Sequence, residues 1–369
     1  MNKPKLNGYT VIVSKRTKPL NRRTLLIKAV VSLAFMAMLF VVAGRKDFLS
    51  MLQQVDPLYF ILSFVIAAAQ ISTSCMKWQV LVNLYGDRLR FGYLMRLYLI
   101  GYYFTNLLPS NVGGDVIRSY YAGRRIGNQT HSAISVFMER FTGSIYLLIL
   151  VLAAPLFDRA VYRHPAVWIP ALGAAGLLLV FVVLGLYAKG VLRLLNRMLD
   201  RLTGAPSNRP RSGLARALAW IRGQSEAIGA KLAQTIQILK GNPRAAMAVV
   251  GLTILFYSLT WVNVYFGYRT FGITPDFRDI VALLATAMLV SSIPITLGSL
   301  GLAEGAYVFY FNLTGIHPAA TLAMGLFLRF KLIVVGLVGF IAYLAHPLER
   351  NENERIEQDL ATGSPTGDS

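Results

Sequence analysis

Residues 106–125 read NLLPSNVGGDVIRSYYAGRR, and residues 294–307 read PITLGSLGLAEGAY. In both stretches a proline is followed four residues later by a glycine, and the first acidic residue after it is Asp115 or Glu304. An arginine lies twenty-five residues beyond each acid. Because proline and glycine interrupt helices, the two stretches mark breaks in the chain. Their shared spacing predicts an internal repeat.

The chain around these breaks is apolar. Of its 369 residues, 55% are hydrophobic and 15% are charged, and the mean hydropathy is +0.52, which excludes ordinary soluble domains. Several segments reach the length of about 18 apolar residues that a helix needs to cross a bilayer. We therefore expect a multi-pass membrane protein. The apolar segments are 24–43, 57–83, 91–108, 131–155, 166–188, 245–269, 280–315 and 317–345.

The charge is strongly basic, with 37 Lys and Arg against 17 Asp and Glu. In a soluble protein this excess would suggest nucleic acid, but in a membrane protein it marks cytoplasmic loops, so we expect no nucleic acid partner. Residues 1–23 hold seven basic residues and no acid, and residues 189–244 hold eleven basic residues and two acids. Both segments are therefore predicted to be cytoplasmic.

This prediction fixes the number of crossings. Five full crossings before residues 189–244 would place that segment outside, so one apolar segment must fail to cross. We interpret 91–108 and 112–125 as the arms of a re-entrant hairpin that enters from the cytoplasm, and 280–315 as a second hairpin that enters from outside. Irregular backbone at membrane depth is tolerated only beside protein or a watered cavity, so each tip predicts a site.

The predicted fold is an all-α polytopic membrane protein with an inverted repeat. About six full transmembrane helices and two opposed re-entrant hairpins make eight hydrophobic units, with both termini cytoplasmic. Residues 1–23 form a basic leader, and 24–345 form the transmembrane domain. That domain includes a basic amphipathic cytoplasmic insertion at 189–244. Residues 346–369 are predicted to be a polar, disordered cytoplasmic tail.

The charged residues at the tips have two interpretations each. Arg118 could offer a planar fork to a phosphate, or it could pair with Asp115 across one helical turn and only hold the hairpin shut. Glu304 could bind a proton or cation, or it could form a structural ion pair with Arg329 or Lys331. A charge at membrane depth is costly and is usually functional.

Two further charges, Glu139 and Arg140, lie within the apolar segment 131–155. Adjacent helical residues point about 100° apart, so these two cannot face the same partner. With Arg329 and Lys331 in the corresponding segment of the second half, we expect them to line one polar cavity between the halves.

Other residue types point away from catalysis and metal binding. Cys75 is the only cysteine and the four histidines are scattered, so we expect no disulfide, no metal site and no cofactor. Motifs of nucleotide hydrolysis and of hydrolases are absent from the sequence. Lys77 and Trp78 are interpreted as interfacial anchors at the inner end of the 57–83 segment, without a function.

Four runs carry a resemblance to a known family: NLLPSNVGGDVIR, MERF at 138–141, PITLGSLGLAEG, and LFLRF at 326–330. In this order they resemble the lysylphosphatidylglycerol synthase transmembrane family of flippase-like proteins, over about residues 24–345. The resemblance implies a protein of the bacterial inner membrane that moves a lipid or lipid-linked head group between leaflets. Only a short polar tail follows residue 350, so the soluble aminoacyl-transferring domain of the founding members, and its enzymatic chemistry, are not carried over.

The resemblance also implies which residues line the substrate path. We expect Arg118, Arg140 and Arg329 to bind the phosphate of the head group, and Glu139 and Glu304 to gate or balance charge. The full set of residues carried over for substrate binding is Asn106, Pro109, Gly113, Gly114, Asp115, Arg118, Glu139, Arg140, Pro294, Gly298, Gly301, Glu304 and Arg329.

Two departures from the family pattern make the expected cavity less acidic. Residues 141–144 lack an aspartate that the family often has there, and Lys331 replaces a common aromatic residue. Both favour an anionic substrate, either an anionic phospholipid or a polyprenyl-phosphate-linked lipid. Two alternatives remain. The chain could be a scaffold that docks a lipid-modifying or glycosyl-transferring enzyme through residues 189–244, or it could be a membrane-embedded transferase.

Overall fold

The computed structural model shows helices and short turns, with no strand among the residues that it describes. The leader, most of the basic insertion, the C-terminal tail, Pro109 and Pro294 lie outside these residues. The described residues are 53–85, 88–107, 113–154, 164–181, 237–293 and 295–345, with scattered positions between 30 and 50.

Four helices are long and apolar enough to cross a membrane. Each begins at a residue whose side chain accepts a backbone N–H of the first turn, and in three of the four a proline occupies the first turn, where its missing N–H costs nothing. They coincide with four of the six predicted spans. The four helices are α3 (Pro57–Val82), α6 (Gln129–Ala153), α9 (Pro243–Arg269) and α12 (Pro318–Leu344).

Between these long helices lie two pairs of shorter ones. The first pair is α4 (Phe91–Leu107) and α5 (Gly113–Ile126), and the second is α10 (Phe277–Ser291) and α11 (Leu302–Asn312). Both pairs break where the proline and glycine stretches predict. A further apolar helix, Pro165–Phe181, covers part of the predicted segment 166–188.

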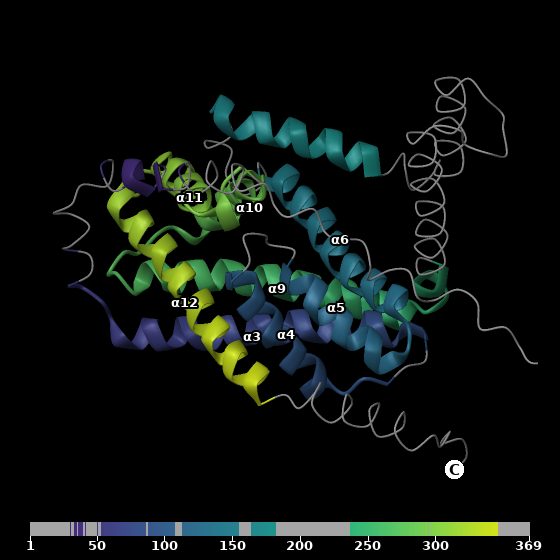
Figure 1. Ribbon diagram of the computed structural model, residues 1–369. Coiled ribbons are helices and arrows are strands. Elements are labelled where there is room, and N and C mark those ends of the chain that lie inside the picture. The colour runs from purple at the N-terminus through teal and green to yellow at the C-terminus, as the bar shows by residue number, and fades with distance from the viewer. Residues whose placement is uncertain are drawn as a thin grey trace, which may run out of the picture.

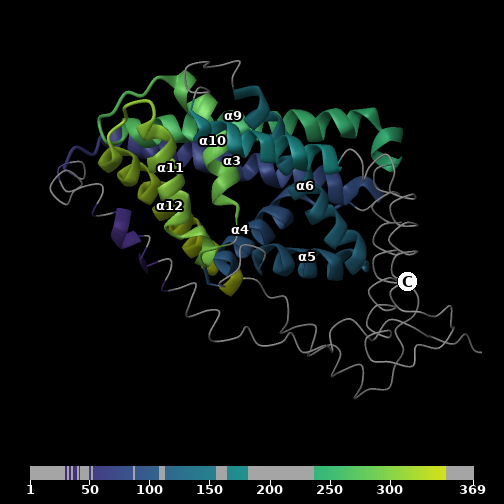
Figure 2. The ribbon, with the colours of Figure 1, turned by 90° about the horizontal axis from the view of Figure 1, so that it is seen from above.

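The two halves repeat one order of elements: long helix, hairpin, long helix. The first long helices, α3 and α9, lie side by side, with α10, α11 and α12 toward one end and α5 and α6 toward the other (Figures 1 and 2). The second arm of each hairpin packs on the last helix of its own half, α5 on α6 and α11 on α12. The first arm packs on the last helix of the other half, α4 on α12 and α10 on α6. These matching contacts confirm the internal repeat.

Small residues set the distance between helices in the first half. A Cβ added to Gly114 would collide with the backbone carbonyl of Gly101, so the two arms of the first hairpin touch through their backbones. A Cβ on Gly339 of α12 would likewise collide with the carbonyl of Leu99 on α4. Within lipid, where no hydrophobic force drives helices together, such close backbone packing holds them in contact.

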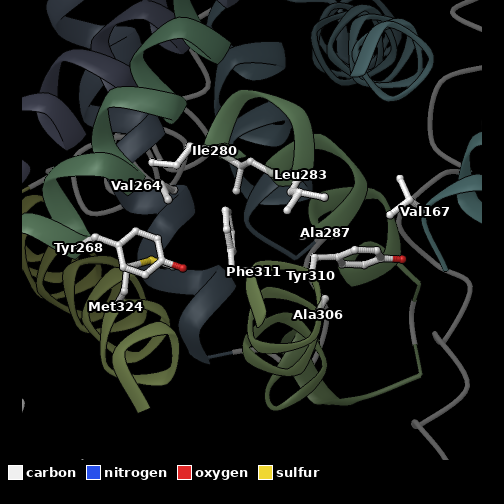
Figure 3. Close-up of a cluster of buried hydrophobic side chains, with 11 residues drawn as sticks. Val167, Val264, Tyr268, Ile280, Leu283, Ala287, Ala306, Tyr310, Phe311 and Met324 are labelled. Carbon is white, nitrogen blue, oxygen red and sulfur yellow. The ribbon is translucent and has the colours of Figure 1, made fainter. Parts of the chain in front are cut away.

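A cluster of buried side chains holds the second hairpin in place (Figure 3). Phe311 of α11 is fully buried, and its ring meets that of Tyr268 of α9 edge-on at a centroid distance of 5.6 Å. The Tyr268 hydroxyl lies 3.0 Å from the Thr321 hydroxyl of α12. Tyr310 donates a hydrogen bond to the carbonyl of Ala166 at 3.0 Å, which ties α11 to the helix that begins at Pro165. The C-terminal end of α11 is therefore held against α9 and against the helix that begins at Pro165.

Candidate functional site

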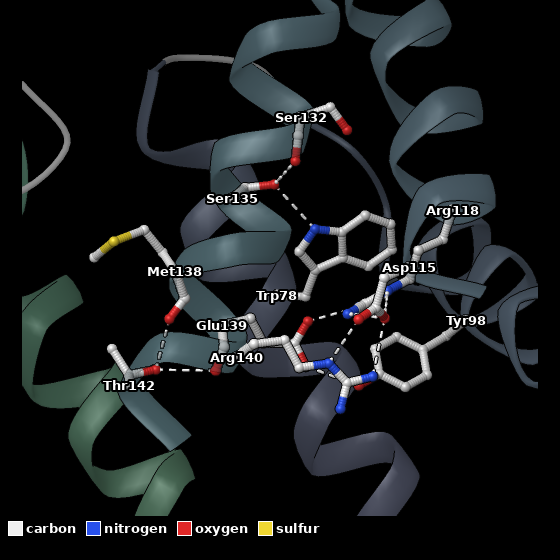
Figure 4. Close-up of polar contacts among 10 residues, drawn as sticks. All are labelled: Trp78, Tyr98, Asp115, Arg118, Ser132, Ser135, Met138, Glu139, Arg140 and Thr142. Atoms are coloured by element: carbon white, nitrogen blue, oxygen red, sulfur yellow. Dashed lines mark hydrogen bonds and ion pairs between the residues drawn. The ribbon is translucent and has the colours of Figure 1, made fainter. Parts of the chain in front are cut away.

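Arg118 lies at the centre of the first group of charges, with its side chain only 2% exposed (Figure 4). Its Nη1 donates to Glu139 Oε2 at 2.6 Å, and its Nε donates to Asp115 Oδ1 at 3.1 Å. The guanidinium also lies over the rings of Trp78 and Tyr98, with its carbon 4.8 and 4.5 Å from their centroids. The predicted contact with Asp115 across one turn is confirmed, and Arg118 is held by four side chains.

Glu139, which accepts the hydrogen bond from Arg118, is itself buried. Its second carboxylate oxygen accepts a hydrogen bond from the Tyr98 hydroxyl at 2.8 Å. Trp78 is itself fixed, because its indole N–H donates to Ser135 of α6 at 3.0 Å. Four helices, α3, α4, α5 and α6, thus each contribute a side chain that positions Arg118.

Arg140 reaches the surface from the same group. It forms two parallel hydrogen bonds with Asp115, from Nε to Oδ2 and from Nη2 to Oδ1, both at 2.9 Å. Its side chain is 59% exposed, whereas that of Asp115 is 16% exposed. Because Glu139 binds Arg118 and Arg140 binds Asp115, the two adjacent residues have different partners, as their angular separation predicts. We call Asp115, Arg118, Glu139 and Arg140 the first cluster.

The second tip is built around Glu304, which is buried. Its Oε1 accepts a hydrogen bond from Arg329 Nε at 2.5 Å, and its Oε2 accepts the backbone N–H of Gly301 at 2.8 Å. Arg329 also donates to the carbonyl of Ser299 at 3.3 Å. The ion pair with Arg329 was one of the two predicted partners of Glu304, and it ties α12 to the tip. We call Glu304 and Arg329 the second cluster.

The backbone of this tip is left-handed at three positions. Gly298 has φ 55°, Gly301 has φ 81°, and Ser299 adopts φ 57° although it has a side chain. Glycine adopts this region without cost, whereas other residues adopt it rarely. The glycines therefore allow the sharp turn that presents the Ser299 carbonyl and the Gly301 N–H to the second cluster.

The two clusters occupy matching places in the repeat. Asp115 is the third residue of α5 and Glu304 is the third residue of α11. Arg140 and Arg329 are each the twelfth residue of α6 and α12. The spacing of twenty-five residues in the sequence thus brings each acid against its arginine.

Lys331 does not join this arrangement. It is 2% exposed and donates to Ser63 Oγ of α3 at 2.5 Å and to Asn263 Oδ1 of α9 at 2.6 Å, with the ring of Phe327 4.7 Å away. Two residues along a helix turn through about 200°, so Lys331 faces away from Arg329. That Glu139, Arg140, Arg329 and Lys331 line one polar cavity between the halves stays a prediction, and Lys331 itself is turned toward α3 and α9.

Lys77 and Trp78 are not interfacial anchors. Both are buried, Lys77 at 4% exposure and Trp78 at 0%, because α4, α6 and α9 pack around α3 at this level. The charged neighbours of Lys77 are Glu139, Arg140 and Arg118, so it belongs beside the first cluster. Its position several residues before the end of a long apolar run was the signal that could have indicated burial.

The remaining predicted residues shape the first hairpin. Asn106 donates to the carbonyl of Leu332 on α12 at 2.8 Å, Gly113 begins α5, and Gly114 allows the two arms to touch. In the part of the chain that the structure describes, no group of three or more His, Cys, Asp or Glu side chains is placed to hold a metal ion.

Comparison with known proteins yields two relatives, both named UPF0104 membrane protein and both from Methanothermobacter thermautotrophicus. One is 24% identical over 335 residues, which cover 87% of this chain and 93% of the relative. The other is 19% identical over 300 residues, covering 80% and 88%. No solved structure matches the chain. The family model for the lysylphosphatidylglycerol synthase TM region matches residues 25–339, and this multi-pass membrane protein therefore belongs to that family.

Proposed function

We propose that this chain moves a phosphate-bearing lipid or lipid-linked head group between the leaflets of the bacterial inner membrane, as a flippase or scramblase, without changing any bond of the lipid. The observation that carries the proposal is the pair of matching ion pairs, Asp115–Arg140 and Glu304–Arg329, each between a hairpin and a long apolar helix. Repeats of this kind place a substrate site between two halves that can move against each other.

The hairpins support an architecture of six spans and two re-entrant pairs. Their arms have 17, 14, 15 and 11 residues, whereas a crossing needs about 20. We therefore infer that each pair of arms enters the membrane and returns to the side from which it came. The positive charge of the basic leader and insertion supports cytoplasmic termini, and with this orientation the two hairpins enter from opposite sides.

The charges favour an anionic head group. Among the described residues, the two clusters and Lys77 bring together four cations and three carboxylates, so one positive charge has no acidic counterpart. Arg140 uses two of its five N–H donors on Asp115 and is exposed, so it can also bind a phosphate oxygen. The acyl or prenyl chains would stay in the bilayer while the phosphate passes between the clusters. Anionic phospholipids and polyprenyl-phosphate-linked lipids both fit this chemistry.

Leaflet exchange of labelled lipids in liposomes that hold the purified protein tests the proposal. We expect movement of anionic lipids and its loss in Arg140→Gln, because the neutral amide keeps polarity but removes the charge and the double hydrogen bond. Arg96→Gln, an exposed arginine of α4 outside both clusters, is the matched control and should retain exchange. Equal exchange in wild type and Arg140→Gln would contradict a direct role of the ion pair.

A further inference from the structure

Lys77 is the one cation beside the first cluster that makes no hydrogen bond or ion pair with the described residues. It lies on α3, it is 4% exposed, and the nearest carboxylate charge is Glu139. Glu139 already binds Arg118 through one oxygen and Tyr98 through the other. A lysine that is enclosed in a membrane protein without a paired acid is costly, and such residues usually mark a substrate or ion path.

The ammonium of Lys77 lies beside an open position on α6. A Cβ added to Gly143 would lie 3.7 Å from Lys77 Nζ and 3.9 Å from the Tyr257 hydroxyl, and no other atom outside the helix would come within 4 Å. Tyr257 donates its hydroxyl hydrogen to the Gly143 carbonyl at 2.8 Å. Gly143 therefore leaves room for a small group on α6, bordered by the Lys77 ammonium and the Tyr257 hydroxyl.

This space lies on the same face of α6 as the exposed Arg140. Residues three apart on a helix are neighbours on its surface, so Gly143 follows Arg140 by one turn. The accessible guanidinium and the buried ammonium thus line one side of α6, with the guanidinium nearer the surface.

The charge balance points to the same ligand. Among the residues that the structure describes, Lys77, Arg118 and Arg140 face two acids, Asp115 and Glu139, so one positive charge is unmatched there. Lys331 is also without an acid, but neutral oxygens of two other side chains already accept its hydrogen bonds. The unmatched charge that is free to bind a ligand is therefore that of Lys77.

We infer that Lys77 binds phosphate oxygens of a group with one net negative charge, that Arg140 receives this group first, and that Lys77 makes the protein prefer net-anionic over zwitterionic head groups. The inference rests on the proposed function, because it places the phosphate of the moved lipid. A zwitterionic head group would leave the positive charge beside α6 uncompensated, whereas a head group of charge −1 cancels it.

Binding to the purified protein in uncharged detergent tests the inference separately from transport. The probes are short-chain phosphatidylglycerol, short-chain phosphatidylcholine and inorganic phosphate, each titrated against wild type and three variants. Lys77→Met removes the charge at similar length. Gly143→Asp leaves Lys77 in place but puts a carboxylate within its reach. Arg96→Gln, at an exposed arginine of α4 outside both clusters, is the control that removes one positive charge elsewhere.

We expect wild type and Arg96→Gln to bind phosphatidylglycerol about tenfold or more tightly than phosphatidylcholine, the ratio that one charged hydrogen bond supplies. Lys77→Met and Gly143→Asp should both lose this preference. An equal preference in all four proteins would overturn the inference, even if wild type moves lipids.

The same titration separates the possible sources of the phosphate. Binding of inorganic phosphate that Lys77→Met abolishes would support the anion site and assign it to a water-soluble ligand. Binding of phosphatidylglycerol but not of inorganic phosphate would assign it to the lipid head group. If the lipid binds with the expected preference but does not change leaflet, the proposed function fails while the Lys77 site stands.

Discussion

At the scale of the residue, the structure distinguishes charges that hold the fold from charges that are available. Arg118 is enclosed by two carboxylates and two aromatic rings, whereas Arg140 is exposed and Lys77 is unpaired. The three residues are of similar chemical type, and the sequence alone does not rank them. Their surroundings tie Arg118 to the structure of the hairpin and support our proposal that the other two bind the ligand.

This distinction predicts opposite effects on stability. Glu139→Gln removes the closest counter-charge of a buried arginine and should destabilise the protein by about 3 kcal/mol. Lys77→Met removes an unpaired buried charge and should leave stability unchanged or raise it. Thermal unfolding of both variants in the same detergent measures the difference. A lower melting temperature for Lys77→Met than for Glu139→Gln would mean that Lys77 has a structural partner.

At the scale of the element, hydropathy and helix breakers predicted most of the fold. The segment 57–83 corresponds to α3 and 317–345 to α12, and both predicted breaks separate two helices. A bilayer imposes a minimum length on each crossing, so length alone identifies the long helices. Hydropathy does not identify which side of an apolar helix meets another helix. The burial of Lys77 and the turning away of Lys331 were therefore missed.

The site was predicted in part for a similar reason. The equal spacing of acid and arginine in the two halves predicted which residues meet, because a repeat places equal spacings in equal positions. The contacts of Arg118 with Trp78 and Tyr98 depend on how α3 and α4 pack against α5, and no spacing within one helix encodes that.

Packing of the first hairpin on α12 can be tested at one glycine. In Gly339→Ala the new methyl group would collide with the Leu99 carbonyl, and relief of such overpacking costs about 1–3 kcal/mol. We expect a lower melting temperature and weaker transport. Gly251→Ala on α9, where a Cβ meets nothing within 4 Å, is the matched control and should be neutral. Equal stability of the two variants would contradict the close contact between α4 and α12.

At the scale of the whole molecule, each half contains the same kind of ion pair between a hairpin and a long helix. Each half places an acid at the third position of a hairpin arm against an arginine on the next long helix. The surroundings differ, since only the first cluster has an exposed arginine and an unpaired lysine beside it. We therefore propose that the first half selects the head group and that movement requires the ion pairs of both halves.

The most direct test of this claim is the rate of leaflet exchange of phosphatidylglycerol in liposomes that hold wild type, Asp115→Asn or Glu304→Gln, with Arg96→Gln as control. Asp115→Asn removes the carboxylate that pairs with Arg140 and Arg118, and Glu304→Gln removes the carboxylate that pairs with Arg329. Both changes keep the volume of the side chain. We expect exchange in wild type and in the control, and an exchange rate at least tenfold lower in each of the other two variants. Folded wild-type protein that moves no lipid of any head group would contradict this expectation, and would favour a scaffold that holds a lipid-modifying enzyme.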